Sequence, residues 1–144
     1  MSKLLSDRYV KELFELGSAY SDPVEVFPNI KVVFRILSVD DLVEVGEALT
    51  EFTGIESRTI VSQVQTLARA IVEINGMVLV LPPAEVDKLE EKLNRKVTRV
   101  DQAAYILATE FPKFMLDELN QAYINYYRDV LEDVDSVKKK SKKP

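Results

Sequence analysis

The sequence predicts a mostly helical α+β domain, with five to six helices and a small two-stranded β element in the N-terminal third. Apolar residues recur at helical spacing along most of the 144 residues, whereas alternation typical of a strand is confined to one segment near residue 30. Only four glycines and six prolines interrupt the chain, which favours long regular elements. The apolar fraction of 47% suffices for one ordinary hydrophobic core.

The first third of the chain predicts a helix followed by a β hairpin. A helix is expected over residues 1–20, where apolar side chains share one face. These residues are Leu5, Tyr9, Leu13 and Leu16, with Val10 and Phe14 widening the stripe. Residues 24–27 are expected as an edge strand and 29–37 as its partner, joined through a tight turn at Pro28-Asn29. A ribbon of two strands is marginal alone, so we expect it to pack on helices.

Two helices are expected in the middle of the chain. Ser38 and Asp41 have the spacing of a capping box, which predicts a helix running from there to about Phe52. We expect this helix to bury its apolar positions, which are Leu42, Val45, Leu49 and Phe52. A second helix is expected from about Glu56, with a wide apolar face that indicates a central position.

The dipeptide Asn75-Gly76 leaves two alternatives open. Gly76 is either the left-handed residue just beyond the end of the second helix, or part of a type I′ turn between two extended segments, Val72–Ile74 and Met77–Leu79. The long helical stripe that precedes it favours the helix end. A short extended segment from Met77 to Leu81 then follows.

The last part of the chain predicts three further helices. Pro83 suits the first turn of one helix, because a first-turn residue donates no intrahelical hydrogen bond. Thr98 and Asp101 form a second capping box at the start of the next, which Pro112 breaks or kinks. The last and longest helix is expected from Phe114 to about Asp135.

The composition excludes several classes of function. The chain contains no histidine, cysteine or tryptophan, so the usual catalytic triads, zinc sites and redox chemistry are unavailable to it. No phosphate-binding glycine loop is present. Adjacent acidic residues lie at predicted helix starts or outer faces, where capping and solvation explain them: Asp40-Asp41, Glu90-Glu91 and Asp117-Glu118. We therefore expect no enzymatic activity, no catalytic residues, no cofactor and no metal site.

The net charge of −5 conceals an asymmetry between the body of the chain and its end. The last seven residues hold five lysines and no acid, so the remainder has a charge near −10. Such a body repels nucleic acid and anionic membranes, and we expect neither as a partner. We expect residues 1–137 to form a single helical domain and 138–144 a flexible basic tail. No signal peptide or membrane-spanning run is recognisable, which predicts a cytoplasmic protein.

Three tyrosines on the last predicted helix are candidate partner-binding residues. Tyr123, Tyr126 and Tyr127 are three and four residues apart and therefore lie on one side of that helix. Tyrosine is common at protein interfaces because it combines apolar area with a polar tip. Packing in the core explains the same pattern, and both alternatives remain open.

Two stretches resemble a family of bacteriophage proteins. They are KVVFRILSVDDLVEVGEAL, residues 31–49, and LARAIVEINGMVLVLP, residues 67–82. Their order is similar to that of the small proteins encoded beside the tape-measure gene of long-tailed phages, in which a β segment with a characteristic Arg, Leu, Ser/Thr and acidic residue precedes a helical remainder. The residues that match this pattern are Arg35, Leu37, Ser38 and Asp41. The helix expected over residues 1–20 is longer than in that family.

The resemblance implies a role in building a phage tail. Members of this family are tail assembly chaperones or baseplate-hub assembly proteins. They bind the long helical tape-measure or hub protein before the tail tube polymerises, and they have no catalytic site. We therefore expect a non-enzymatic assembly protein of the host cytoplasm, a role compatible with homo-oligomer formation. The alternative is a structural subunit of the virion in the baseplate, neck or tail.

Overall fold

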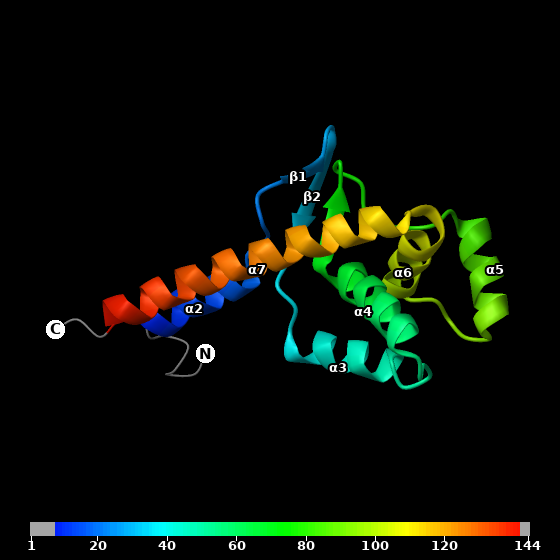
Figure 1. Ribbon diagram of the computed structural model, residues 1–144, viewed down its shortest axis with the longest axis horizontal. Coiled ribbons are helices and arrows are strands. Elements are labelled where there is room, and N and C mark those ends of the chain that lie inside the picture. The colour runs from blue at the N-terminus through cyan, green and yellow to red at the C-terminus, as the bar shows by residue number, and fades with distance from the viewer. Residues whose placement is uncertain (1–7, 142–144) are drawn as a thin grey trace.

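The computed structural model describes residues 8–141, within which six helices pack with a three-stranded antiparallel sheet that lies at one edge of the molecule (Figure 1). In chain order the elements are α2 (Arg8–Ser18), β1 (Val24–Phe27), β2 (Ile30–Phe34), α3 (Val39–Ala48), α4 (Ile55–Ala70), β3 (Ile71–Ile74), α5 (Pro83–Leu93), α6 (Arg99–Glu110) and α7 (Lys113–Ser141). The predicted mostly helical α+β class is confirmed. The predicted start of the first helix at residues 1–7, and Lys142 and Lys143 of the expected tail, lie outside the described residues.

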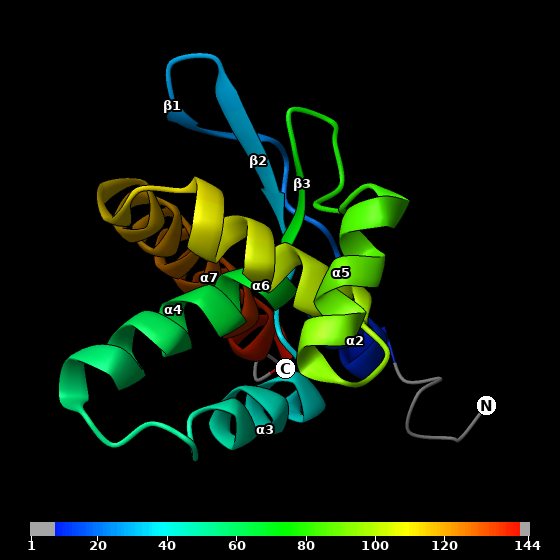
Figure 2. The same cartoon turned by 90° about the vertical axis from the view of Figure 1, so that its right-hand side faces the viewer.

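The sheet contains the predicted hairpin and a third strand, β3, which corresponds to the extended segment Val72–Ile74 of the less favoured alternative. β1 and β2 pair as antiparallel neighbours across Pro28-Asn29, where Asn29 has a φ of 66°. β2 is the central strand of the order β1-β2-β3, because it pairs with β3 along its other edge. Side chains alternate along β2, so that Val32 and Phe34 are fully buried on one face. The two-stranded element is therefore corrected to three strands (Figure 2).

The preferred interpretation of Asn75-Gly76 as a helix end is wrong. α4 ends at Ala70, and the next four residues are a strand instead of a last helical turn. Asn75 and Gly76 have φ values of 51° and 77°, the left-handed backbone that a type I′ turn requires, and Ile74 pairs with Met77 across them. The apolar residues of Ile71–Ile74 fit the helical stripe of α4, but this segment is rich in β-branched residues and fits a strand equally well. Its pairing with β2 decides in favour of the strand.

The predicted helix boundaries at capping residues and prolines are confirmed. Ser38 and Thr98 are the N-caps of α3 and α6, each with the complete capping box. Pro83 is the first residue of α5, and Pro112 separates α6 from α7. The hydrophobic core lies where β2 and β3 meet α4, α6 and α7. Its largest fully buried side chains are Phe34, Leu67, Leu107, Leu119 and Val32.

The burial predicted for the helix after Ser38 is only partly correct. Val45 is buried, and Leu49 and Phe52 are half-buried, but Leu42 is 57% exposed. α3 is an outer helix that packs against α4 on one side, so only the face around Val45 is covered. Leu42 lies beyond the edge of that contact.

α2 and the C-terminal half of α7 form a two-helix arm that extends away from the sheet and from α3–α6 (Figure 1). α7 continues past its predicted end near Asp135 to Ser141, so residues 138–141 of the segment expected to be a flexible tail are helical. None of the helices within residues 8–141 is both long and apolar enough to cross a membrane.

Candidate functional site: an apolar groove with an acidic rim

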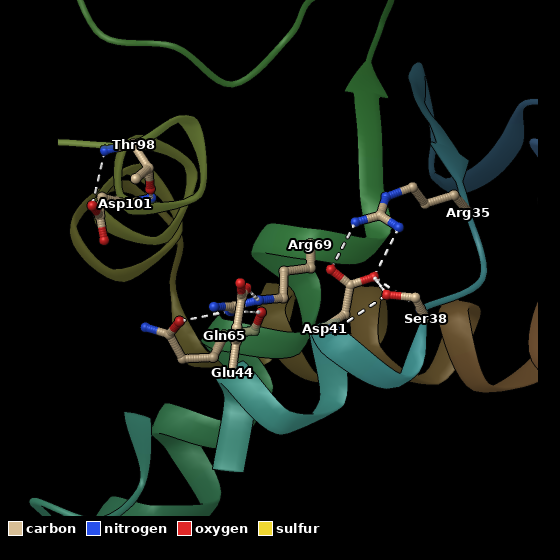
Figure 3. Close-up of polar contacts among 8 residues, drawn as sticks. All are labelled: Arg35, Ser38, Asp41, Glu44, Gln65, Arg69, Thr98 and Asp101. Atoms are coloured by element: carbon tan, nitrogen blue, oxygen red, sulfur yellow. Dashed lines mark hydrogen bonds and ion pairs between the residues drawn. The ribbon is translucent and has the colours of Figure 1, made fainter. Parts of the chain in front are cut away.

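Arg35, Ser38 and Asp41, three of the four residues that match the family pattern, form a clamp at the start of α3 (Figure 3). The two terminal nitrogens of Arg35 donate to the two carboxylate oxygens of Asp41, at 3.0 and 3.3 Å. Asp41 also accepts the backbone N–H of Ser38 at 2.8 Å and its hydroxyl at 2.9 Å. Burial raises the pKa of Asp41, but the hydrogen bonds from Arg35 and Ser38 outweigh burial and leave that pKa below its ordinary value. The clamp joins the end of β2 to the first turn of α3.

The same clamp recurs at the start of α6. Arg95, Thr98 and Asp101 repeat the spacing of Arg35, Ser38 and Asp41. Arg95 donates to both carboxylate oxygens of Asp101 at 2.6 and 3.0 Å, and these hydrogen bonds lower the pKa of Asp101. In both places the pattern Arg-x-x-Ser/Thr-x-x-Asp caps the helix and fixes the direction in which the preceding chain enters it.

We expect Asp41→Asn to lower the free energy of unfolding by about 2 kcal/mol near neutral pH, because it removes charge-assisted hydrogen bonds and half of a capping box. The pKa of Asp41 in the folded protein lies below 3.8. Its contribution is therefore complete above that value and is lost as the pH falls through the folded-state pKa. The difference between wild type and variant should be constant above about pH 5 and shrink below about pH 4.

Urea unfolding of both proteins from neutral to acidic pH measures this difference. Asp40→Asn is the matched control, because Asp40 is exposed and lies outside the clamp. A stability difference for Asp41→Asn that does not change with pH would contradict the role assigned to the carboxylate.

A groove of about 710 Å³ lies between α3, α4, α5 and α6. Its apolar lining comes from all four helices and the turn after α3, and consists of Ala48, Phe52, Ile60, Val61, Val64, Leu89, Leu93, Ala104, Tyr105 and Ala108. Val64 and Leu89 are buried, whereas Ile60, Leu93 and Tyr105 are 41%, 41% and 36% exposed. The groove therefore presents large apolar side chains to an occupant.

One rim of the groove is acidic. Glu44, Glu47 and Glu51 follow one another at intervals of three and four residues, so they lie on one side of α3 and the turn after it. Glu44 forms an ion pair, but Glu47 and Glu51 form none within residues 8–141. Lys92 lies on the opposite rim, on α5. An occupant would meet negative charge along its α3 side.

Arg69 fixes the base of the groove (Figure 3). Its side chain is 8% exposed, and it is the one buried charged residue in the described part of the chain. Nε donates to Glu44 at 3.1 Å, and a terminal nitrogen donates to the backbone and side-chain oxygens of Gln65 at 3.0 and 2.8 Å. The bond to Glu44 holds α3 against the C-terminal end of α4, whereas the two bonds to Gln65 lie within α4 and orient the guanidinium group.

The charged side chains of the groove are paired with one another or spread along a rim, and they do not converge on a point. Glu44 binds Arg69 and Asp101 binds Arg95, while Glu47 and Glu51 lie along the rim formed by α3 and the turn after it. Across residues 8–141, no three acidic side chains lie close enough to hold a metal ion. The groove therefore suits the binding of an apolar surface whose edge carries charged groups.

The three candidate tyrosines do not share one surface, and none of them lines the groove. Tyr123 is 8% exposed and belongs to the core, and burial raises the pKa of its hydroxyl. Tyr126 is half-buried, stacks on Phe34 with ring centroids 6.3 Å apart, and donates its hydroxyl to the Ala19 carbonyl at 3.1 Å. Tyr127 is 43% exposed and alone presents a large free surface.

Comparison of the chain with protein-family models, with curated proteins and with solved structures gave no match. The groove and the resemblance of residues 31–49 and 67–82 to phage assembly proteins are therefore the two grounds for proposing a function.

Proposed function

We propose that the protein is a non-enzymatic phage tail or baseplate assembly protein, which binds a tape-measure or hub protein in the host cytoplasm during virion morphogenesis. The observation that carries this proposal is the apolar groove with its acidic rim. The sequence resemblance supplies the class of client.

The groove suits an amphipathic helix. Such a helix presents apolar side chains at intervals of three and four residues, and it is about 10 Å wide. Ile60, Leu93 and Tyr105 provide apolar contacts from three different helices, so that an inserted helix is surrounded on several sides. Basic residues on the flank of the client would lie beside Glu47 and Glu51.

Covering such helices has a physical purpose. A long helical client exposes apolar stripes before it reaches its place in the tail, and exposed apolar surface promotes aggregation. A small protein that covers one stripe removes that apolar surface from water and so keeps the client soluble.

Quantitative mass spectrometry on two samples tests the proposal. A tagged copy is used to capture partners from the lysate of infected cells, and the phage particles are purified separately. We expect a tape-measure or hub protein in the captured fraction and none of this protein in particles. A fixed copy number in particles would instead identify a structural subunit, and the absence of both would refute any tail role.

A further inference from the structure

One face of the α2–α7 arm carries exposed apolar side chains. On α7, Ile124, Tyr127 and Leu131 are 40%, 43% and 45% exposed. They are spaced by three and four residues, which is the spacing of a coiled-coil seam. The neighbouring stripe of α7, which includes Tyr123 and Tyr126, is turned by about 100° and packs on the core. α7 therefore has two apolar stripes, one that packs on the core and one, formed by Ile124, Tyr127 and Leu131, that is exposed.

α2 adds an aromatic side chain to this face. A shallow cavity on one side of the arm is lined by residues of both helices, among them Glu12 and Asp133. In a helix, the side chains of residues two positions apart point in directions that differ by about 200°. Phe14, two residues after Glu12, and Leu131, two before Asp133, therefore both point to the opposite side. Phe14 is 64% exposed there, and α2 buries none of its described residues.

The charges beside the α7 stripe are self-complementary. Arg128 and Asp135 lie on the same flank, three residues before and four residues after Leu131. They are about 10 Å apart along the helix, too far to pair within one chain. Neither forms an ion pair within residues 8–141. Antiparallel packing of two α7 helices about Leu131 would bring the Arg128 of one copy opposite the Asp135 of the other, twice.

We propose that a second copy of this chain covers this face, so that two arms form an antiparallel four-helix contact about a two-fold axis near Leu131. A two-fold contact needs a surface that is complementary to itself, and the Arg128–Asp135 flank has that property. Phe14 and the stripe of α7 then fill the layer between the arms.

The size of the face sets the concentration at which the dimer forms. From Ile124 to Asp135 the stripe is about 17 Å long, and two helices side by side are about 20 Å wide. A face of this size is smaller than the interfaces of stable dimers and lies in the range of weak, transient contacts, so we expect a dissociation constant of about 100 µM. Measurements therefore need to extend to hundreds of micromolar.

Sedimentation equilibrium of the full chain, from about 5 to about 500 µM, tests the proposal. We expect a monomer–dimer equilibrium for the wild type. Arg128→Glu and Asp135→Arg alone each place like charges opposite one another and weaken the dimer about tenfold or more. An equimolar mixture of the two variants forms a heterodimer in which both pairs are again of opposite charge, so it should associate about as tightly as the wild type.

Asp129→Arg is the matched control for these charge changes. Asp129 is two residues before Leu131 and therefore points about 200° away from the stripe, toward a cavity beside β1. We expect this variant to dimerise like the wild type, and circular dichroism checks that all variants remain helical. A monomeric wild type at the highest concentration, or a mixture no tighter than its two components, would overturn the proposal. So would an equal loss of association in Asp129→Arg.

Discussion

Phe34→Ala is expected to lower the free energy of unfolding by about 4 kcal/mol, the largest loss that we expect from any single truncation in this chain. Phe34 is fully buried in the central strand, where its ring contacts Tyr123 and Tyr126 with centroids 5.8 and 6.3 Å apart. Truncation removes the buried ring, leaves a cavity, and abolishes two aromatic contacts of about 0.5–1.5 kcal/mol each.

The loss at Phe34 should extend beyond the sheet. Tyr126 stacks on Phe34 and donates its hydroxyl to the Ala19 carbonyl at 3.1 Å, just after α2. Ser21 adds a second link, because its hydroxyl accepts the Phe34 N–H at 2.8 Å. Phe34 therefore supports the base of the α2–α7 arm as well as the core, and its removal should increase amide hydrogen exchange in α2.

Phe114→Ala is the matched control, because it makes the same truncation at a position that is 63% exposed. Phe114 contacts Phe27 edge to face with centroids 6.3 Å apart, and we expect its loss to cost less than about 1 kcal/mol. Urea unfolding followed by far-ultraviolet circular dichroism measures both variants. Equal losses for the two would mean that the core is not organised around Phe34.

The boundaries of the elements were largely predictable because they depend on local chemistry. A capping box acts within four residues, and a proline acts on its own turn, so Ser38, Thr98 and Pro112 mark helix ends in the sequence itself. β3 was not predictable in the same way. Ile71 and Ile74 continue the helical stripe of α4 and also suit a strand, and only pairing with β2 decides between them.

The candidate site was predictable only in parts. Ile60 and Leu93 are apolar residues within predicted helices, but nothing in the sequence indicates that they come together in the fold. Their meeting depends on the angles between α3, α4, α5 and α6, which are set by long-range contacts such as that of Arg69 with Glu44. Burial on α7 was ambiguous for the same reason, since Tyr123 and Tyr127 have equal apolar area but opposite surroundings.

Ile60→Lys is expected to weaken binding of the client helix about a hundredfold, on the proposal that this helix occupies the groove. Ile60 is 41% exposed and lies in the apolar lining, where a bound helix would cover it. Burying an unpaired ammonium group against apolar side chains costs several kcal/mol, and the cation also repels the basic flank expected of the client. The chain alone should keep its stability within about 1 kcal/mol, because a partly exposed lysine reaches solvent.

Ile55→Lys separates an effect of the groove from a general effect of positive charge. Ile55 belongs to the same helix and is 85% exposed, but it lies outside the groove, in a shallower cavity between α4 and α7. Isothermal titration of each variant with a helical fragment of the captured client should show wild-type affinity for Ile55→Lys and the loss for Ile60→Lys. If both bind equally well, the client does not use the groove, even where capture from lysate succeeds. Because the two variants have the same net charge, an equal weakening of both would indicate attraction between the acidic body and a basic client, without insertion of a helix.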